Sequence, residues 1–420
     1  MKKVNIILVM LSALAMFTPV FSGYVVGIWM LMATLILRKE ILSPPSLAAK
    51  RDFYQILRPI SISALIFWGL LIIAGVWAAL DSEAVDLKAA RHGLVHFGVK
   101  YVVLWFGYSC FMWRLAATKY LLKAFAYSYG AASSVHGIYC MAQRQYGIDW
   151  NHGFYSSLGE GRFAYGVYRI SGLVGHPLTL GFCLALSLVS CLTLYRLADS
   201  KWEKNAWLSG IICSALLLAL SGSRGPQLTA LLACPILFPF KSFRTHWKKI
   251  AISLTIAILF CWFNGVFSRY LELATANIGG DMRLVHWSVH WRVFVDHMFH
   301  GLGPGASRDS ISSYYLAAGV NDTITLAHNS YLQFAADYGL LGLLGALVWT
   351  FSWARVARNT LVVKRGLWAL FAVIVLSSIT QNTLQDSEFV FALTLWTLVL
   401  VAKDCVLSVS ACKTPCPQHV

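Results

Sequence analysis

Four side chains of this sequence suit chemistry on a phosphate-bearing substrate: His328 and three arginines, Arg169, Arg224 and Arg283. An ordinary imidazole is mostly neutral above about pH 6.5, so a histidine accepts a proton from a hydroxyl group near neutral pH. Guanidinium groups hold phosphate oxygens through paired, charge-assisted hydrogen bonds. One base and several arginines therefore predict group transfer from a phosphate-type leaving group to a hydroxyl.

Arg224 lies in the short connection 221-SGSRG-225, between two apolar runs. An arginine beside hydrocarbon usually faces a cavity, a partner or a ligand. The flanking glycines allow close approach to the backbone. Backbone amides at the helix start marked by Pro226 favour an anion. The alternative is an arginine whose charged end reaches water at a helix terminus.

Arg283 opens the aromatic-rich stretch 283-RLVHWSVHWRVFVDHMF-299. Trp287, Trp291 and Phe294 recur at helical spacing, which predicts one apolar face and a helix lying in the membrane interface. His286 and His290 stand four residues apart in the same stretch. A zinc site needs a further ligand and usually a carboxylate base, so no metal is expected. The following 301-GLGPG-305 predicts a plain structural turn.

His328 stands immediately before an apolar run that continues to Trp349. Taken alone, it suits a core or interface histidine satisfied by a neighbouring group better than it suits a base. The elements around it decide between these interpretations.

The composition indicates that the elements around these four residues are membrane helices. Hydrophobic residues form 58% of the chain and charged residues 12%, and the mean hydropathy is +0.64. The apolar blocks are about 15–25 residues long, enough to cross a bilayer. The predicted class is an all-α, polytopic integral membrane protein of about 12 transmembrane helices, the first of them retained. The predicted spans are 4–20, 23–37, 60–80, 96–113, 124–142, 173–195, 206–220, 226–240, 250–267, 330–351, 366–381 and 389–403.

The charges orient these spans. With the N-terminus in the cytoplasm, the inside loops hold 23 of the 34 Lys and Arg residues, as the positive-inside rule requires. The net charge of +16 is thus a topology signal, and no nucleic-acid partner is expected. Residues 1–420 form one membrane domain with two long outer loops, 143–172 and 268–329. The second is expected to carry short amphipathic helices, and 404–420 form a cytoplasmic tail.

The motifs together resemble a known family. His328-Asn329, nine residues, Gly339, two residues and Gly342 fit the pattern His-[Asn/Ser/Gln]-x9-Gly-x-x-[Gly/Thr/Tyr], which resembles the signature of bacterial O-antigen ligases. Other landmarks over residues 160–345 resemble the same superfamily, which includes O-antigen polymerases and protein O-oligosaccharyltransferases. They are Arg169 with Gly172 and Pro177, SGSRG around Arg224, and Arg283 with Trp287 ahead of 301-GLGPG-305.

The resemblance implies a glycosyltransferase of the bacterial inner membrane, with a periplasmic active site and both termini cytoplasmic. Its donor would be O-antigen on undecaprenyl diphosphate, its acceptor a sugar hydroxyl of lipid A–core, and membrane lipids would surround it. No metal or other cofactor is implied. His328 resembles the base, and Arg224 and Arg283 resemble the clamp on the diphosphate. Substrate contacts are expected from Arg169, Asn329, Trp287 and Arg292. A base attacking opposite the leaving group predicts inversion.

Two alternatives stay open. One is a sister transferase, either an O-antigen polymerase or a protein O-oligosaccharyltransferase. The other is a transporter or flippase, which would need polar groups near mid-membrane. The transferase reading requires the base and the arginines to flank one sugar, so it predicts that His328 lies close to the arginines.

Overall fold

The computed structural model describes residues 2–17, 25–30, 32, 44–81, 95, 100–148, 163–164, 167–174, 176–238, 255, 282–303, 308–321 and 326–412. Helices dominate this part of the chain. Its strands, β1 (Phe163–Ala164) and β2 (Val167–Tyr168), form one short antiparallel pair. The predicted helical class is confirmed.

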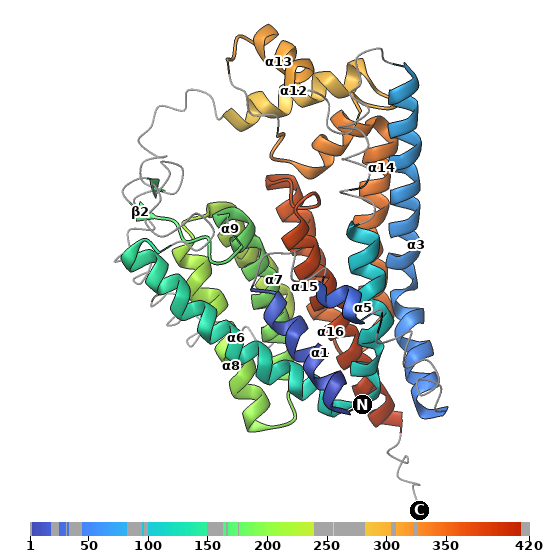
Figure 1. The fold of residues 1–420 in the computed structure, drawn as a ribbon, viewed down its shortest axis with the longest axis vertical. Coiled ribbons are helices and arrows are strands. Elements are labelled where there is room, and N and C mark those ends of the chain that lie inside the picture. The colour runs from blue at the N-terminus through green and yellow to red at the C-terminus, as the bar shows by residue number, and fades with distance from the viewer. Residues whose placement is uncertain are drawn as a thin grey trace, which may run out of the picture.

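Most of the predicted spans coincide with helices (Figure 1). The main helices are α1 (Lys2–Ala15), α3 (Pro44–Asp81), α5 (Lys100–Ala117), α6 (Lys119–Tyr146), α7 (Pro177–Arg196), α8 (Lys201–Leu220), α9 (Arg224–Ala233), α14 (Ser330–Asn359), α15 (Lys364–Thr380) and α16 (Ser387–Cys412). The predicted spans 23–37 and 250–267 lie mostly outside the described residues.

Five of the described helices are long and apolar enough to cross a membrane, which makes the chain a multi-pass membrane protein. They are Lys50–Leu80, Pro177–Arg196, Lys201–Leu220, Ser330–Asn359 and Ser387–Ser408. The count of twelve is not confirmed. For example, α9 has ten residues before the 3-10 helix η3 (Cys234–Leu237). Ten helical residues rise about 15 Å, half of the hydrocarbon thickness.

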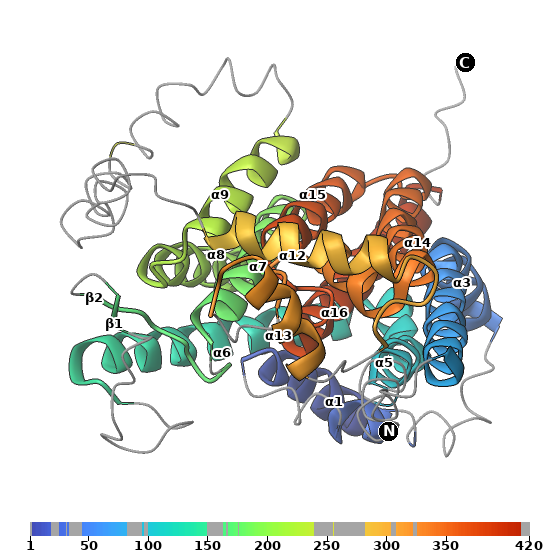
Figure 2. The ribbon, with the colours of Figure 1, turned by 90° about the horizontal axis from the view of Figure 1, so that it is seen from above.

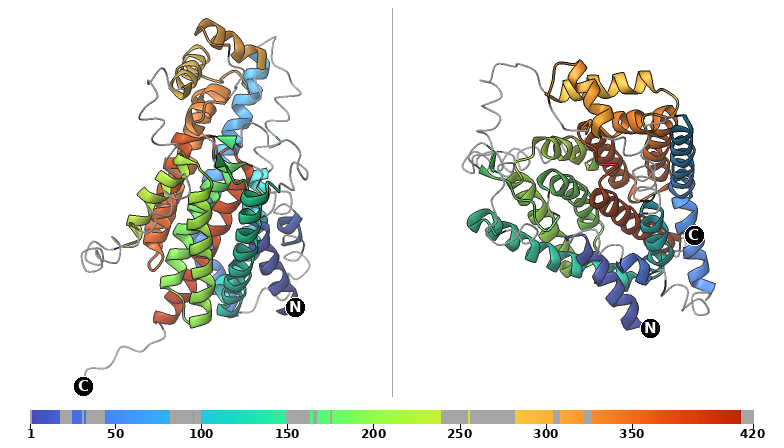
Figure 3. Two further views of the ribbon diagram at one scale, coloured as in Figure 1. Left: turned by 90° about the vertical axis from the view of Figure 1, so that its left-hand side faces the viewer. Right: turned by 45° about the horizontal axis from the view of Figure 1, so that its top comes forward.

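Helix α16 is the centre of the bundle (Figures 1 and 3). In its apolar span 94% of the residues are buried. Trp396 packs edge-on against Tyr129 of α6, with ring centroids 4.8 Å apart, and also contacts Trp207 of α8. Its indole N–H donates to Ser187 Oγ of α7 at 3.1 Å. One tryptophan therefore joins four helices, which fixes their relative positions.

Two helices of the long loop lie across one end of the bundle: α12 (Met282–Asp296) and α13 (Arg308–Ala317) (Figures 1 and 2). They share a small apolar core with α14, formed by Val289, Val293, Ile311, Tyr315 and Ala336. The expected short helices of this loop are therefore present. Which side of the membrane they occupy stays a prediction.

The face of α12 that packs against the protein includes two histidines, and a place for its aromatic face in the membrane interface stays a prediction. Its buried residues are His286, Val289, His290, Val293 and Phe294, whereas Trp291 is 57% exposed. The buried histidines are satisfied by hydrogen bonds. Nδ1 of His290 donates to the carbonyl of His286 at 2.8 Å.

Helix α14 is broken at Gly339, where φ is 63° and ψ is −152°. The turn after α12 fills the break. Leu340 N donates to Met298 O at 2.7 Å, and Leu302 N donates to Ala336 O at 2.9 Å. A Cβ at Gly339 would lie 2.5 Å from the Phe299 carbonyl carbon. Only glycine fits such close backbone contact, so this break fixes α12 against α14.

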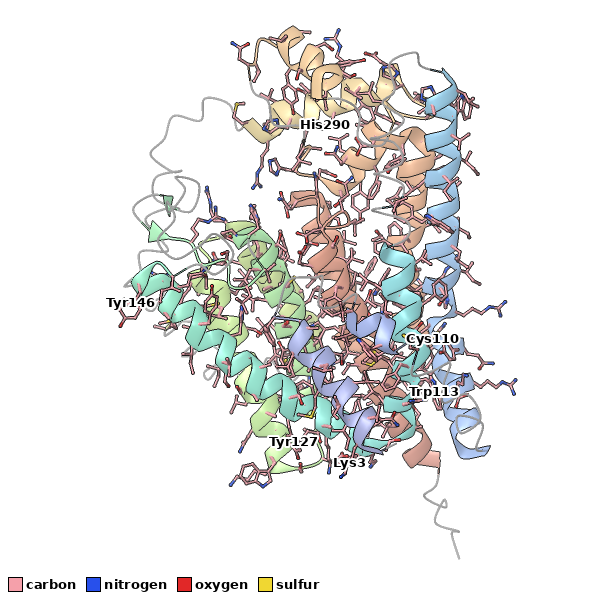
Figure 4. All side chains as sticks on the ribbon, viewed as in Figure 1. Lys3, Cys110, Trp113, Tyr127, Tyr146 and His290 are labelled. Carbon is pink, nitrogen blue, oxygen red and sulfur yellow. The ribbon has the colours of Figure 1, made fainter. Side chains whose placement is uncertain are left out.

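The opposite end of the bundle is held by buried charges. Lys403 Nζ lies 3.2 Å from Glu203 Oε1, and both side chains are almost fully buried. Asp404 Oδ1 accepts from the backbone N–H groups of Val362 and Val363 and so caps the start of α15. Lys3 lies at this end, whereas His290 lies at the other (Figure 4).

Candidate active site

His328 lies at the entry to α14, half-buried, with a φ of 51°. Residues with side chains other than glycine rarely adopt a positive φ, and such strain persists only where neighbours enforce it. Two contacts do so here. Gln333 Oε1 accepts from the N–H of Ala327 at 2.7 Å. Asn329 caps the helix by accepting from Leu332 N at 3.1 Å. Hydrogen bonds of the residues before and after His328 therefore fix the backbone that carries the imidazole.

The Asn329 cap gives a local reason for the residue types that the motif accepts. Asn and Ser are among the best N-cap residues. Asn329 Oδ1 is used within α14, and substrate contact by this side chain stays a prediction.

The ring of His328 contacts the connection between α15 and α16. Its Nδ1 lies 2.7 Å from Gln381 Oε1. Ser330 Oγ donates to the Gln381 carbonyl at 3.0 Å and accepts from Leu384 N at 3.0 Å. The start of α14 and this connection therefore form one hydrogen-bonded unit.

Helix α12 covers the other side of the histidine. The ring of His286 lies 5.8 Å from that of His328. Nδ1 of His286 is 2.7 Å from the hydroxyl of Tyr315 on α13. Arg283 is three residues before His286, and Cβ atoms at that spacing are about 5–6 Å apart on a helix. The exposed Arg283 is thereby placed on the helix that lies over His328.

The other two predicted site residues of α12, Trp287 and Arg292, do not lie together on the helix. Trp287 follows His286 and is half-buried, and its indole nitrogen is buried with no hydrogen-bond partner. Arg292 is nine residues beyond Arg283. At 3.6 residues per turn it points to the opposite side of α12. The helix therefore separates Arg292 from Arg283.

Arg169 and the SGSRG turn form a second cationic group. Arg169 Nη2 donates to Ser223 Oγ at 2.7 Å, and its Nε donates to the Ser221 carbonyl at 3.4 Å. Gly222 has a φ of 61° and lies against the Arg169 side chain. Arg224 is half-buried in the first turn of α9. The fold therefore brings Arg169 to the turn that carries Arg224, although 52 residues separate Arg169 from Ser221.

The end of α15 links this group to the histidine. A Cβ on Gly225 would lie 3.7 Å from Thr380 Oγ1. Thr380 is the last residue of α15 and directly precedes Gln381. The arginine turn thus lies against Thr380, and His328 contacts the next residue, Gln381. His328 lies between α12, which carries Arg283, and the α15 end, which contacts the turn of Arg224.

Asp386 closes the connection on its far side. Its Oδ1 accepts from Glu388 N and Phe389 N at the start of α16, and its Oδ2 accepts from Thr179 Oγ1 of α7. Burial raises the pKa of Asp386 to about 7, and the neighbouring Glu388 carboxyl adds to the rise. This carboxyl therefore ties α7 to the connection that holds His328.

Sequence reasoning missed Gln381 and Tyr315. Gln381 lies in 378-SITQNTLQD-386, which joins two predicted spans on the predicted outer side. Three amides and a carboxyl in such a short connection were an available signal: Gln381, Asn382, Gln385 and Asp386. Tyr315 had no comparable signal, because its partner His286 is 29 residues away.

The arrangement suits general base chemistry beside a bound anion. It joins one imidazole with a fixed hydrogen-bond partner to arginines on two neighbouring elements. No curated protein matches this chain. Residues 209–347 match a family model described as O-antigen ligase. This match covers Arg224, Arg283 and His328, so the segment that carries all three is similar to that family.

Proposed function

We propose that this protein transfers O-antigen polysaccharide from undecaprenyl diphosphate to a sugar hydroxyl of lipid A–core, at the periplasmic face of the inner membrane. The placement of His328 carries the proposal. It lies at a helix entry between α12 and the end of α15, beside elements that carry Arg224 and Arg283. A lipid-linked donor and an acceptor head group would meet at such an entry. The segment that matches the family model carries the proposed base, His328, and the two arginines proposed to hold the diphosphate.

The proposed reaction is a single displacement at the anomeric carbon. His328 takes the proton of the acceptor hydroxyl, and the hydroxyl oxygen forms the new bond to that carbon. The bond to the diphosphate oxygen breaks, and its electron pair leaves with undecaprenyl diphosphate. Attack opposite the leaving group inverts the anomeric centre.

Arg224 and Arg283 hold the diphosphate, with Arg169, Asn329, Trp287 and Arg292 as further proposed substrate contacts. Preorganised cations aimed at developing negative charge are usually the largest catalytic contribution. Two guanidinium groups from α9 and α12 would hold the diphosphate from two directions. Orientation of donor and acceptor adds a further contribution. The proposed reaction needs no metal ion, because the arginines balance the charge.

The experiment deletes the gene in its host. The extracted lipopolysaccharide is run on a gel, and the undecaprenyl-linked pool is measured alongside. We expect a bare lipid A–core band and long polymer accumulating on the carrier. Complementation with the intact gene should restore the ladder, and complementation with His328→Ala should not.

Other gel patterns would contradict the proposal. A core band that carries a single repeat unit would identify a polymerase. An unchanged ladder would exclude both ligase and polymerase and would direct attention to glycosylated proteins or to transport. A normal ladder with His328→Ala, at equal protein level, would overturn the assignment of the base.

A further inference from the structure

We infer that Gln381 is a positioning residue for His328: it holds the imidazole in the tautomer whose Nε2 accepts the proton of the acceptor hydroxyl. This inference rests on the proposed function of His328. Gln381 lies outside residues 209–347, which the family model matches. It directly follows α15, outside the stretches that carry the motifs.

The hydrogen bond itself determines the tautomer. The amide oxygen of glutamine only accepts hydrogen bonds. Since Gln381 Oε1 lies 2.7 Å from His328 Nδ1, the proton of this bond must be on Nδ1. A neutral imidazole has one N–H group, so Nε2 carries the free lone pair. The nitrogen that can act as the base is therefore Nε2.

Gln381 is itself held in place. Its backbone N–H donates to Ser377 O at 2.8 Å and closes α15, and its carbonyl accepts from Ser330 Oγ at 3.0 Å. The residue is extended, with φ −160° and ψ 166°, which ends the helix. Because both backbone groups of Gln381 are already hydrogen-bonded, its backbone loses little further conformational freedom when the side chain orients the His328 ring. Its contact with His328 is thus preorganised.

An amide suits this position better than a carboxylate would. A carboxylate would stabilise the protonated imidazole and would also repel a diphosphate bound nearby. The amide orients the ring without adding charge. The ionisable residues on the surrounding elements include His286 and Arg283 of α12, Tyr315 of α13, Asp337 of α14, Arg224 of α9, Asp386 of the connection and Glu388 at the start of α16.

The test measures the rate of polymer transfer against pH, using the full-length protein in lipid nanodiscs with undecaprenyl-linked polymer and lipid A–core. Gln381→Met removes the acceptor at similar size. We expect its rate to fall about 10- to 100-fold, as when the orienting partner of a functional histidine is lost. Gln381→Glu keeps an acceptor. We expect its rate at high pH to fall less than that of Gln381→Met. We also expect its acidic limb to move upward by about one pH unit, because the carboxylate favours the protonated ring.

Two controls separate positioning from damage to the fold. Gln385→Met makes the same chemical change in the same connection, and it should leave the pH profile unshifted. Thermal unfolding of each variant reports stability directly. A slow Gln381→Met protein that unfolds at the temperature of Gln385→Met, together with the shifted Gln381→Glu profile, would support the inference.

The remaining outcomes overturn it in distinguishable ways. Normal rates and profiles in both Gln381 variants, with an inactive His328→Ala, would refute the role of Gln381 and leave the proposed function standing. Equal losses in both variants without a shifted profile would assign Gln381 a structural role only. An active His328→Ala would refute the inference and the proposed base together.

Discussion

At the scale of single residues, His328 and Asn329 divide the work of one motif. Asn329 caps the start of α14. The residue before it, His328, has a positive φ, and its imidazole is held at the entry to the helix. The second half of the motif is equally local. Gly339 breaks α14 so that the turn after α12 fits against it. The spacing of the motif therefore matches two structural features of α14: its capped start at Asn329 and its break at Gly339.

The two arginines of α12 give a residue-scale prediction. Arg283→Ala should lower polymer transfer about 100-fold or more, because it removes a cation aimed at the leaving group. Arg292→Ala, on the opposite side of the same helix, removes only a proposed substrate contact, so it should lower transfer less than Arg283→Ala does. Both residues are exposed, so the two variants should be similarly stable. Lipopolysaccharide gels of complemented deletion strains provide the measurement, and equal losses would refute the separation of the two faces.

At the scale of elements, the Gly339 break is the feature that sets α12 over His328. Gly339→Ala would force a Cβ against the Phe299 carbonyl at a positive φ. We expect a lower unfolding temperature and loss of transfer, because the turn must move away. Gly69→Ala in α3 is the matched control, since a Cβ there meets nothing within 4 Å. That variant should be neutral or more stable by about 0.5–1 kcal/mol. An undisturbed Gly339→Ala protein would contradict the interlocked turn.

The connection after α15 gives a prediction on pH. The pKa of Asp386 is raised to about 7 from its ordinary value of 3.8, so the folded protein keeps a proton that the unfolded chain releases. Stability then falls as the pH rises from about 4 to about 7. Asp386→Asn keeps a residue suited to the N-cap position and removes the loss of stability at high pH, because the amide does not ionise. Its gain in unfolding temperature should be larger at pH 8 than at pH 5, and an equal gain at both would refute the raised pKa.

The elements also show what the sequence can predict. The class and most helix positions follow from local signals, namely apolar runs and residues such as Pro177 at the first helical position. The hydrogen bond between His328 and Gln381 joins residues 53 positions apart, and no local pattern encodes it. The face of α12 that packs against the protein could not be predicted, because His286 and His290 are buried with hydrogen-bond partners. Polar residues of this kind are invisible to hydropathy.

At the scale of the whole molecule, the candidate site and the buried ion pair of Lys403 and Glu203 lie at opposite ends of the bundle. The charge bias of the loops predicts that the site faces the periplasm. Leu316 of α13, 63% exposed, and Leu361 before α15, 78% exposed, lie at these two ends.

Labelling from outside tests this orientation. A membrane-impermeant maleimide applied to spheroplasts should label Leu316→Cys and should label Leu361→Cys only after lysis. The parent protein gives the background from its own cysteines. The reverse pattern would invert the topology and place the candidate site in the cytoplasm.

The central place of α16 has a consequence for biogenesis. This helix leaves the ribosome last of the described helices, yet its apolar span is 94% buried and its Trp396 joins α6, α7 and α8. The earlier helices must therefore enter the bilayer before their common partner exists. Glu203 meets Lys403 only when a residue 200 positions later has been inserted. A chain that stops early would leave the buried Glu203 carboxyl without its cation, and removing one partner of a buried ion pair costs about 3–5 kcal/mol.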